Sequence, residues 1–180
     1  GREHDVVENY LVRWSVRVAM LLYVFALARG LQRGQEPGES DRPGRYTWTL
    51  GCLVFLVHVA AAFHFQHQWS HQLAMQHTAQ EAERVFGWAF GEGIYFSYAF
   101  TLFWFLDVVW MWFNGEGRRQ RARWIPVVLH VFLLTIAING AIIFATGPVR
   151  WVGLLMLGVL AYCWLSGRSN PRQVPQRADS

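Results

Sequence analysis

The sequence predicts an all-α membrane protein, a polytopic bundle of about five transmembrane helices. Three observations support this fold class. Hydrophobic residues make up 53% of the 180 residues. Charged residues make up only 16%, below the roughly 25% of an ordinary soluble domain. Of the ten tryptophans, most, including Trp48, lie near the expected ends of apolar segments, where amphipathic rings rest among lipid headgroups.

Five apolar segments have a length close to the roughly 20 residues that cross a hydrocarbon core. They cover residues 10–28, 46–65, 94–113, 124–145 and 151–166. Because these segments use most of the chain, we expect residues 1–166 to form a single integral membrane domain. Residues 167–180, rich in Ser, Pro, Gln and Arg, are expected to form a disordered cytoplasmic tail.

The arginines predict the orientation in the membrane. All 16 basic residues are arginine, and they concentrate at residues 29–45, at 118–123 and in the tail, whereas Arg84 and Arg150 stand alone in the other two connections. By the positive-inside rule the arginine-rich segments are cytoplasmic and the N-terminus is outside, as expected in a bacterial cytoplasmic membrane. This distribution explains the net charge of +4 without nucleic acid as a partner. Cleavage after Ala28, as in a signal peptide, is the alternative.

The second span is expected to extend beyond the membrane on the external side. Neither Gly nor Pro occurs between Gly51 and Gly87, so no helix-breaking residue marks the membrane surface. A continuous helix over residues 46–84 is about 58 Å long at 1.5 Å per residue. We therefore predict that several turns project outside.

This projection carries most of "HVAAAFHFQHQWSHQLAMQH", residues 58–77, which holds five of the seven histidines. On a continuous helix His67 and His71 are one turn apart and can share a metal ion. The predicted ligands of a copper or zinc ion are His64, His67, His71, Met75 and His77. Gln68 replaces the glutamate that an H-E-x-x-H hydrolase uses as its base, so no catalytic residue is assigned. A solvated polar helix is the alternative interpretation.

Two further candidate sites lie within the spans. Asp107 and His130 are each about six residues from the cytoplasmic end of their helices, so we expect them to pair. His58 and His130 are candidate axial ligands of a b-type haem. A depth difference of about 9 Å between them makes haem the less favoured cofactor.

The sequence therefore leaves several functions open. The favoured one is metal handling or redox chemistry at the external histidine face. A structural or assembly subunit of a larger membrane complex is the alternative, followed by a b-type cytochrome subunit or a transporter. The expected partners are the lipid bilayer and either other membrane subunits or further copies of this chain.

Overall fold

The protein is represented by a computed structural model that describes residues 2–33, 42–113, 124–139 and 148–168. This part of the chain is helical and contains no β-strand, which confirms the all-α class. Its elements are α1 (Arg2–Arg33), α2 (Arg42–Ala61), the π-helix η1 (Ala62–Gln66), α3 (His71–Phe86), the 3-10 helix η2 (Gly91–Gly93), α4 (Ile94–Phe113), α6 (Trp124–Ile138) and α7 (Pro148–Arg168). The arginines at 118–123 and tail residues 169–180 lie outside the described residues.

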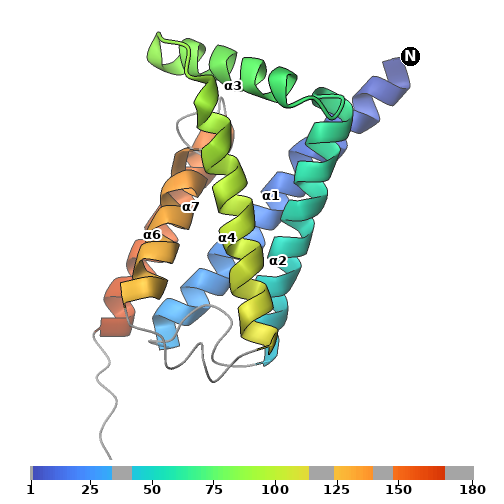
Figure 1. Ribbon diagram of the computed structural model, residues 1–180. Helices are drawn as coiled ribbons and strands as arrows, with labels where there is room; N and C mark the ends of the chain where they lie inside the picture. Colours follow the sequence, from blue (N-terminus) through green and yellow to red (C-terminus); the bar gives the residue numbers. More distant parts are fainter. Residues whose placement is uncertain (1, 34–41, 114–123, 140–147, 169–180) are drawn as a thin grey trace, which may run out of the picture.

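Three of the helical segments are long and apolar enough to cross a membrane. They are Tyr10–Gln32, Arg42–Gln66 and Gly91–Phe113. The helices Val127–Ile138 and Arg150–Ser166 are apolar but shorter, so a total of five spans is not confirmed. In Figure 1, α1, α2, α4, α6 and α7 run along one another as a bundle, and α3 crosses one end of it. Helix α1 packs against α2 and α7, whereas α4 packs against α2 and α6.

Aromatic side chains form the centre of the bundle. Tyr23, Trp48, Phe100 and Trp104 are fully buried. The ring centre of Trp104 lies 5.3 Å from that of Tyr23 and 5.2 Å from that of Trp48. Gly51 permits this packing, because a Cβ atom there would lie 3.1 Å from Cζ2 of Trp104. Trp48 was expected among the lipid headgroups, but its side chain is buried inside the bundle.

The outer surface of the bundle is largely apolar. Leucine, valine and phenylalanine side chains are exposed along each long helix, among them Leu21, Leu53, Phe103, Val131 and Leu155. Large contiguous apolar patches are uncommon on soluble monomers. The surface is therefore consistent with contact between these helices and lipid.

The second span does not continue as one straight helix, so that prediction is wrong. Helix α2 ends at Ala61, the π-helix η1 follows, and the chain turns at residues 67–70 before α3 begins at His71. Figure 1 shows that α3 lies across the end of the bundle and does not project along the axis of α2. The histidines on the two sides of this turn therefore do not share one helical face.

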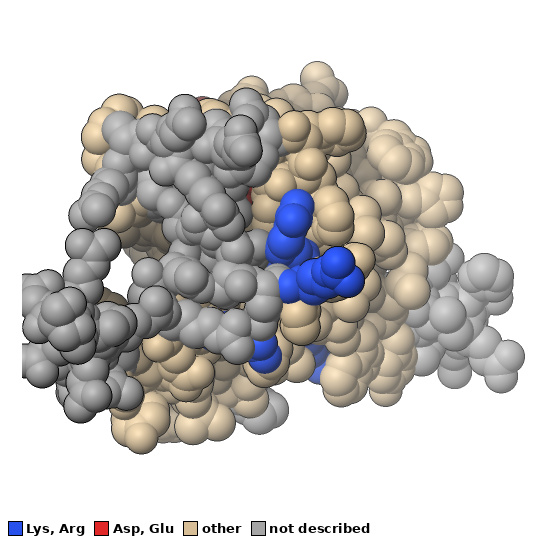
Figure 2. All heavy atoms as spheres, turned by 90° about the horizontal axis from the view of Figure 1, so that it is seen from below, with Lys and Arg blue, Asp and Glu red and all other residues tan. Residues whose placement is uncertain are grey.

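Arginine side chains mark the end of the bundle opposite α3. Figure 2 shows this end, with several basic groups and much of the surface covered by residues that are not described. Here α1 ends at Arg33 and α2 begins with Arg42. Arg45 donates a hydrogen bond to the carbonyl oxygen of Met111 over 3.0 Å, and its guanidinium lies 4.5 Å from the ring centre of Trp112. Arg45 thus helps to hold α2 against α4.

Candidate functional site in the histidine cap

We define the histidine cap as residues 62–93, which comprise η1, the turn at 67–70, α3, and the connection to η2. The turn starts where the amide of His67 donates to the carbonyl oxygen of Ala62 over 3.2 Å. Gln68 and Trp69 then take left-handed backbone conformations, with φ of 48° and 58°, which residues other than glycine adopt infrequently. Ser70 ends the turn, because its Oγ accepts a hydrogen bond from the amide of Leu73 and caps α3.

Close packing fixes α3 against η2. Ala74 and Ala82 are the buried residues of α3. A Cβ atom added at Gly91 would lie 2.8 Å from the carbonyl oxygen of Met75, so only glycine lets the two backbones approach this closely. Met75, a predicted ligand, thus has its side chain against η2.

The turn brings His67 close to His77. Their ring centres are 5.4 Å apart, with 55° between the ring planes. His67 is 7% exposed. Its ring also packs against that of Phe63, with 5.6 Å between the two ring centres. Burial, and secondarily the neighbouring His77, lower the pKa of His67 below its usual range. The buried imidazole is therefore stabilised in the neutral form, which is the form that binds metal.

His71 lies away from His67 and contacts the first turns of α4. Its Nδ1 is 2.9 Å from the hydroxyl oxygen of Tyr98, and its Nε2 is 3.3 Å from that of Tyr95. Neither tyrosine was predicted from the sequence as a partner of His71. The sequence did contain one indication, because a spacing of three residues places two tyrosine hydroxyls on one face of a helix.

His64 also has its own neighbour. Its Nδ1 accepts a hydrogen bond from Nε1 of Trp69 over 3.2 Å. Glu81, one helical turn after His77 on α3, forms a salt bridge with Arg84. The five predicted metal ligands are consequently divided among different neighbours.

No group of three or more His, Cys, Asp or Glu side chains among the described residues is placed to hold one metal ion. This finding does not support the predicted set with His64, His67 and His71 as common ligands. The reason is the turn at 67–70, which removes the one-turn spacing between His67 and His71. What remains of the set as close neighbours is the pair of His67 and His77.

His58 and His130 are not brought together. Nδ1 of His58 lies 2.9 Å from the carbonyl oxygen of Val12 and 3.3 Å from Oγ of Ser15, both in α1. His130 instead packs its ring edge-on to Trp48, with 5.6 Å between ring centres. Trp48 and His58 are ten residues apart on α2, about 15 Å along a helix. This arrangement does not favour one haem iron between the two imidazoles.

Asp107 and His130 contact a common residue. Nε1 of Trp48 donates a hydrogen bond to Oδ2 of Asp107 over 3.1 Å, while the ring of Trp48 contacts His130. Asp107 is 3% exposed. Trp48 was not predicted from the sequence as a common neighbour of the two, and a direct contact of Asp107 with His130 stays a prediction.

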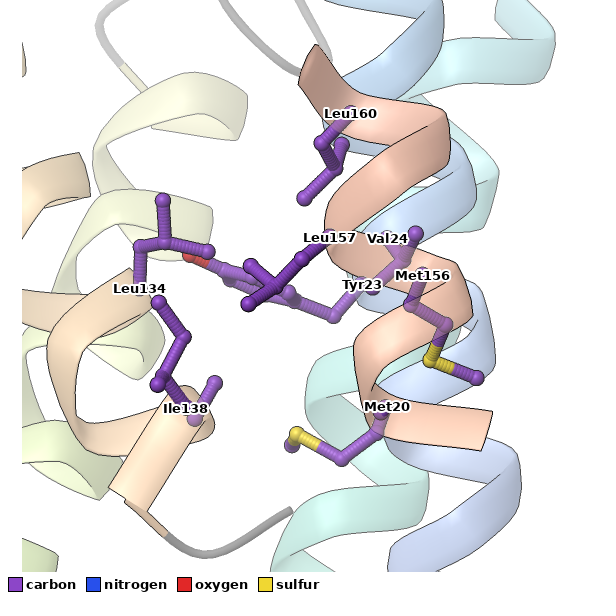
Figure 3. A pocket seen from close by; sticks show the side chains of 10 residues that line it. Met20, Tyr23, Val24, Leu134, Ile138, Met156, Leu157 and Leu160 are labelled. Atoms are coloured by element: carbon purple, nitrogen blue, oxygen red, sulfur yellow. The ribbon is translucent and has the colours of Figure 1, made fainter. Parts of the chain in front are cut away.

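A small cavity lies between α1, α6 and α7. Its volume is about 30 Å³, and about 10–15 Å³ on this measure is enough for one water molecule. Figure 3 shows that Met20, Leu134, Met156 and Leu157 surround it together with the ring of Tyr23. This apolar space is too small for a substrate.

Comparisons of the chain with protein-family models, curated proteins and solved structures find no match.

Proposed function

We propose that the chain is an integral membrane protein that binds a transition metal ion through its histidine cap, at the external surface of the membrane. The observation that carries the proposal is the neighbouring pair of His67 and His77, with His67 buried and its neutral form favoured. Imidazole nitrogen suits copper and zinc among the metals available to proteins. The protein acts here by binding, and no reaction is assigned to it.

The backbone next to the pair supports the same proposal. Gln68 and Trp69 both hold positive φ angles, which cost on the order of 1–3 kcal/mol each when the residue is not glycine. Such conformations concentrate at functional sites. A polar helix with only a solubilising role has no use for this strain directly after His67.

The proposed topology has five spans, an external N-terminus and a cytoplasmic C-terminus. It is supported by arginines at the end opposite α3, including Arg29, Arg42 and Arg45. The cap, on the other end, then lies outside. Labelling of single cysteines in intact cells tests this: a cysteine at Gln80 should react with an impermeant reagent, and one at residue 38 should not. The reverse pattern would reject the topology.

A structural or assembly subunit is the second candidate. It is favoured by aromatic side chains on the cap, because Trp69 is 66% exposed and Trp88 is 60% exposed. Such rings contact either lipid headgroups or another membrane subunit. Under this alternative the imidazoles bind no metal, and the protein purifies with a partner instead.

Metal analysis of the purified full chain separates the two candidates. We expect the wild-type protein to bind added Zn²⁺ or Cu²⁺. A variant with His64, His67, His71 and His77 all changed to alanine should not bind it. His58→Ala is the matched control, since His58 contacts α1 away from the cap, and it should bind as wild type does. Absence of binding by the wild type would reject metal handling.

A further inference from the structure

The geometry of one pair of rings in the cap matches the sharing of a single metal ion. Two imidazole nitrogens, each about 2.0–2.1 Å from a tetrahedral ion, place their ring centres roughly 5 Å apart. The ring centres of His67 and His77 are 5.4 Å apart. Ring planes inclined at 55° differ from the parallel stacking of two rings that merely pack face to face. The distance between the two ring centres is therefore compatible with one nitrogen of each ring binding a common ion.

The other candidate ligands of the cap have different neighbours. Nδ1 of His64 accepts the indole hydrogen of Trp69. Both ring nitrogens of His71 lie within hydrogen-bond distance of tyrosine hydroxyls. The side chain of Met75 lies against Gly91. Bringing any of these three to the ion would break a contact that the cap already has.

We infer that His67 and His77 alone are the protein ligands of this metal, and that the ion is a divalent late transition metal bound most tightly as Cu²⁺. This inference rests on the proposed function. Affinity of a nitrogen site rises along the divalent series to Cu²⁺ and falls again at Zn²⁺. The remaining coordination positions belong to water or to a small exogenous ligand, since no third His, Cys, Asp or Glu of the described part joins the pair.

The two rings have unequal roles in such a site. His67 is buried and its backbone is fixed by the hydrogen bond to Ala62, so its imidazole is held before the ion arrives. His77 is exposed on α3, so its side of the site faces solvent. Metal ions can thus enter and leave past His77, which suits capture or transfer more than permanent storage.

Copper titration of the full chain in detergent tests the inference, with electron paramagnetic resonance as the readout. The spectrum of the Cu²⁺-loaded wild type should show coupling to two imidazole nitrogens. His77→Ala should weaken Cu²⁺ binding at least about tenfold. Removal of a group that only hydrogen-bonds to a metal ligand already costs about 10–100-fold in affinity. Because His77 is exposed, this change should leave the fold intact. His67→Ala should give the same loss.

His64→Ala combined with His71→Ala is the matched control and should bind Cu²⁺ as wild type does. Binding that survives His77→Ala, or that is lost in the control, would overturn the inference while leaving a metal-binding cap in place. No Cu²⁺ or Zn²⁺ binding by the wild type would instead reject the proposed function itself. Tighter binding of Zn²⁺ than Cu²⁺ in a competition titration would contradict the assigned metal.

Discussion

The indole nitrogen of Trp48 donates a hydrogen bond to Oδ2 of Asp107 over 3.1 Å, and this bond joins α2 to α4 inside the bundle. A phenylalanine at position 48 fills most of the space but cannot donate. We expect Trp48→Phe to lower the free energy of unfolding by about 1–3 kcal/mol, because a buried acceptor loses its donor. Denaturant titration in detergent micelles measures this change.

Trp112→Phe is the control for that prediction. Nε1 of Trp112 also donates across the same pair of helices, to Oγ1 of Thr49 over 3.0 Å, but the bond is exposed. Water can replace an exposed donor, so the loss should be smaller, about 1 kcal/mol or less. Equal losses in the free energy of unfolding would show that the bond to Asp107 stabilises the protein no more than the exposed bond does.

Tyr23 offers a test of the opposite sign. Its side chain is fully buried, and among the described residues no group accepts a hydrogen bond from its hydroxyl. A buried hydroxyl without a partner costs about 1–3 kcal/mol. Tyr23→Phe should therefore leave the thermal unfolding temperature unchanged or raise it. A clear decrease would mean that the hydroxyl has a partner outside the described residues.

Gly91 tests how the cap is held. In Gly91→Ala the new Cβ atom would lie 2.8 Å from the backbone oxygen of Met75, so α3 must move away from η2. We expect a loss of about 1–3 kcal/mol, as in other overpacked sites, seen as faster amide hydrogen exchange in α3. Gly158→Ala is the matched control, because a Cβ atom there meets nothing within 4 Å. Unchanged exchange in Gly91→Ala would contradict the packing described.

The metal-free cap should lose stability in mild acid. Burial lowers the pKa of His67, and the titratable group facing its ring is His77. The unfolded cap thus binds a proton more readily than the folded cap. Its stability is complete above the ordinary histidine pKa of about 6.5 and decreases as the pH falls from there toward the pKa of His67 in the folded cap.

Amide hydrogen exchange in α3 between pH 7 and pH 5, corrected for intrinsic exchange rates, measures this effect. His67→Phe keeps a buried ring beside Phe63 and removes the titrating group. The decrease in protection should be smaller in this variant. A decrease of the same size in both proteins would assign the pH dependence to another group.

The sequence predicted the bundle better than the cap. Apolar segments report where helices cross lipid, and α1, α2 and α4 occupy the expected places. The turn at 67–70 was not predicted because Gln68 and Trp69, which have positive φ angles there, are neither Gly nor Pro. The one local signal was Ser70, a favoured N-cap residue immediately before the first residue of α3.

That single turn also explains why the predicted metal ligands were assigned to the wrong neighbours. Helical spacing placed His67 with His71. The observed partner of His67 is ten residues away, and those of His71 are 24 and 27 residues away. The structure instead places His67 with His77, across the turn, and His71 with Tyr95 and Tyr98 on α4. Contacts between separate elements depend on how α3 lies against η2. Residue spacing along a single helix does not contain this information.

X-ray absorption spectroscopy of the metal-loaded full chain tests the site of His67 and His77 directly, because it counts the imidazole ligands of the bound ion. With Zn²⁺ or Cu²⁺ at one equivalent, we expect two imidazole nitrogens at about 2.0–2.1 Å, with oxygen atoms completing the coordination. His77→Ala should reduce the imidazole count to one or abolish binding. Three or more imidazoles in the wild type, or a coordination sphere of oxygen alone, would contradict a site made by His67 and His77.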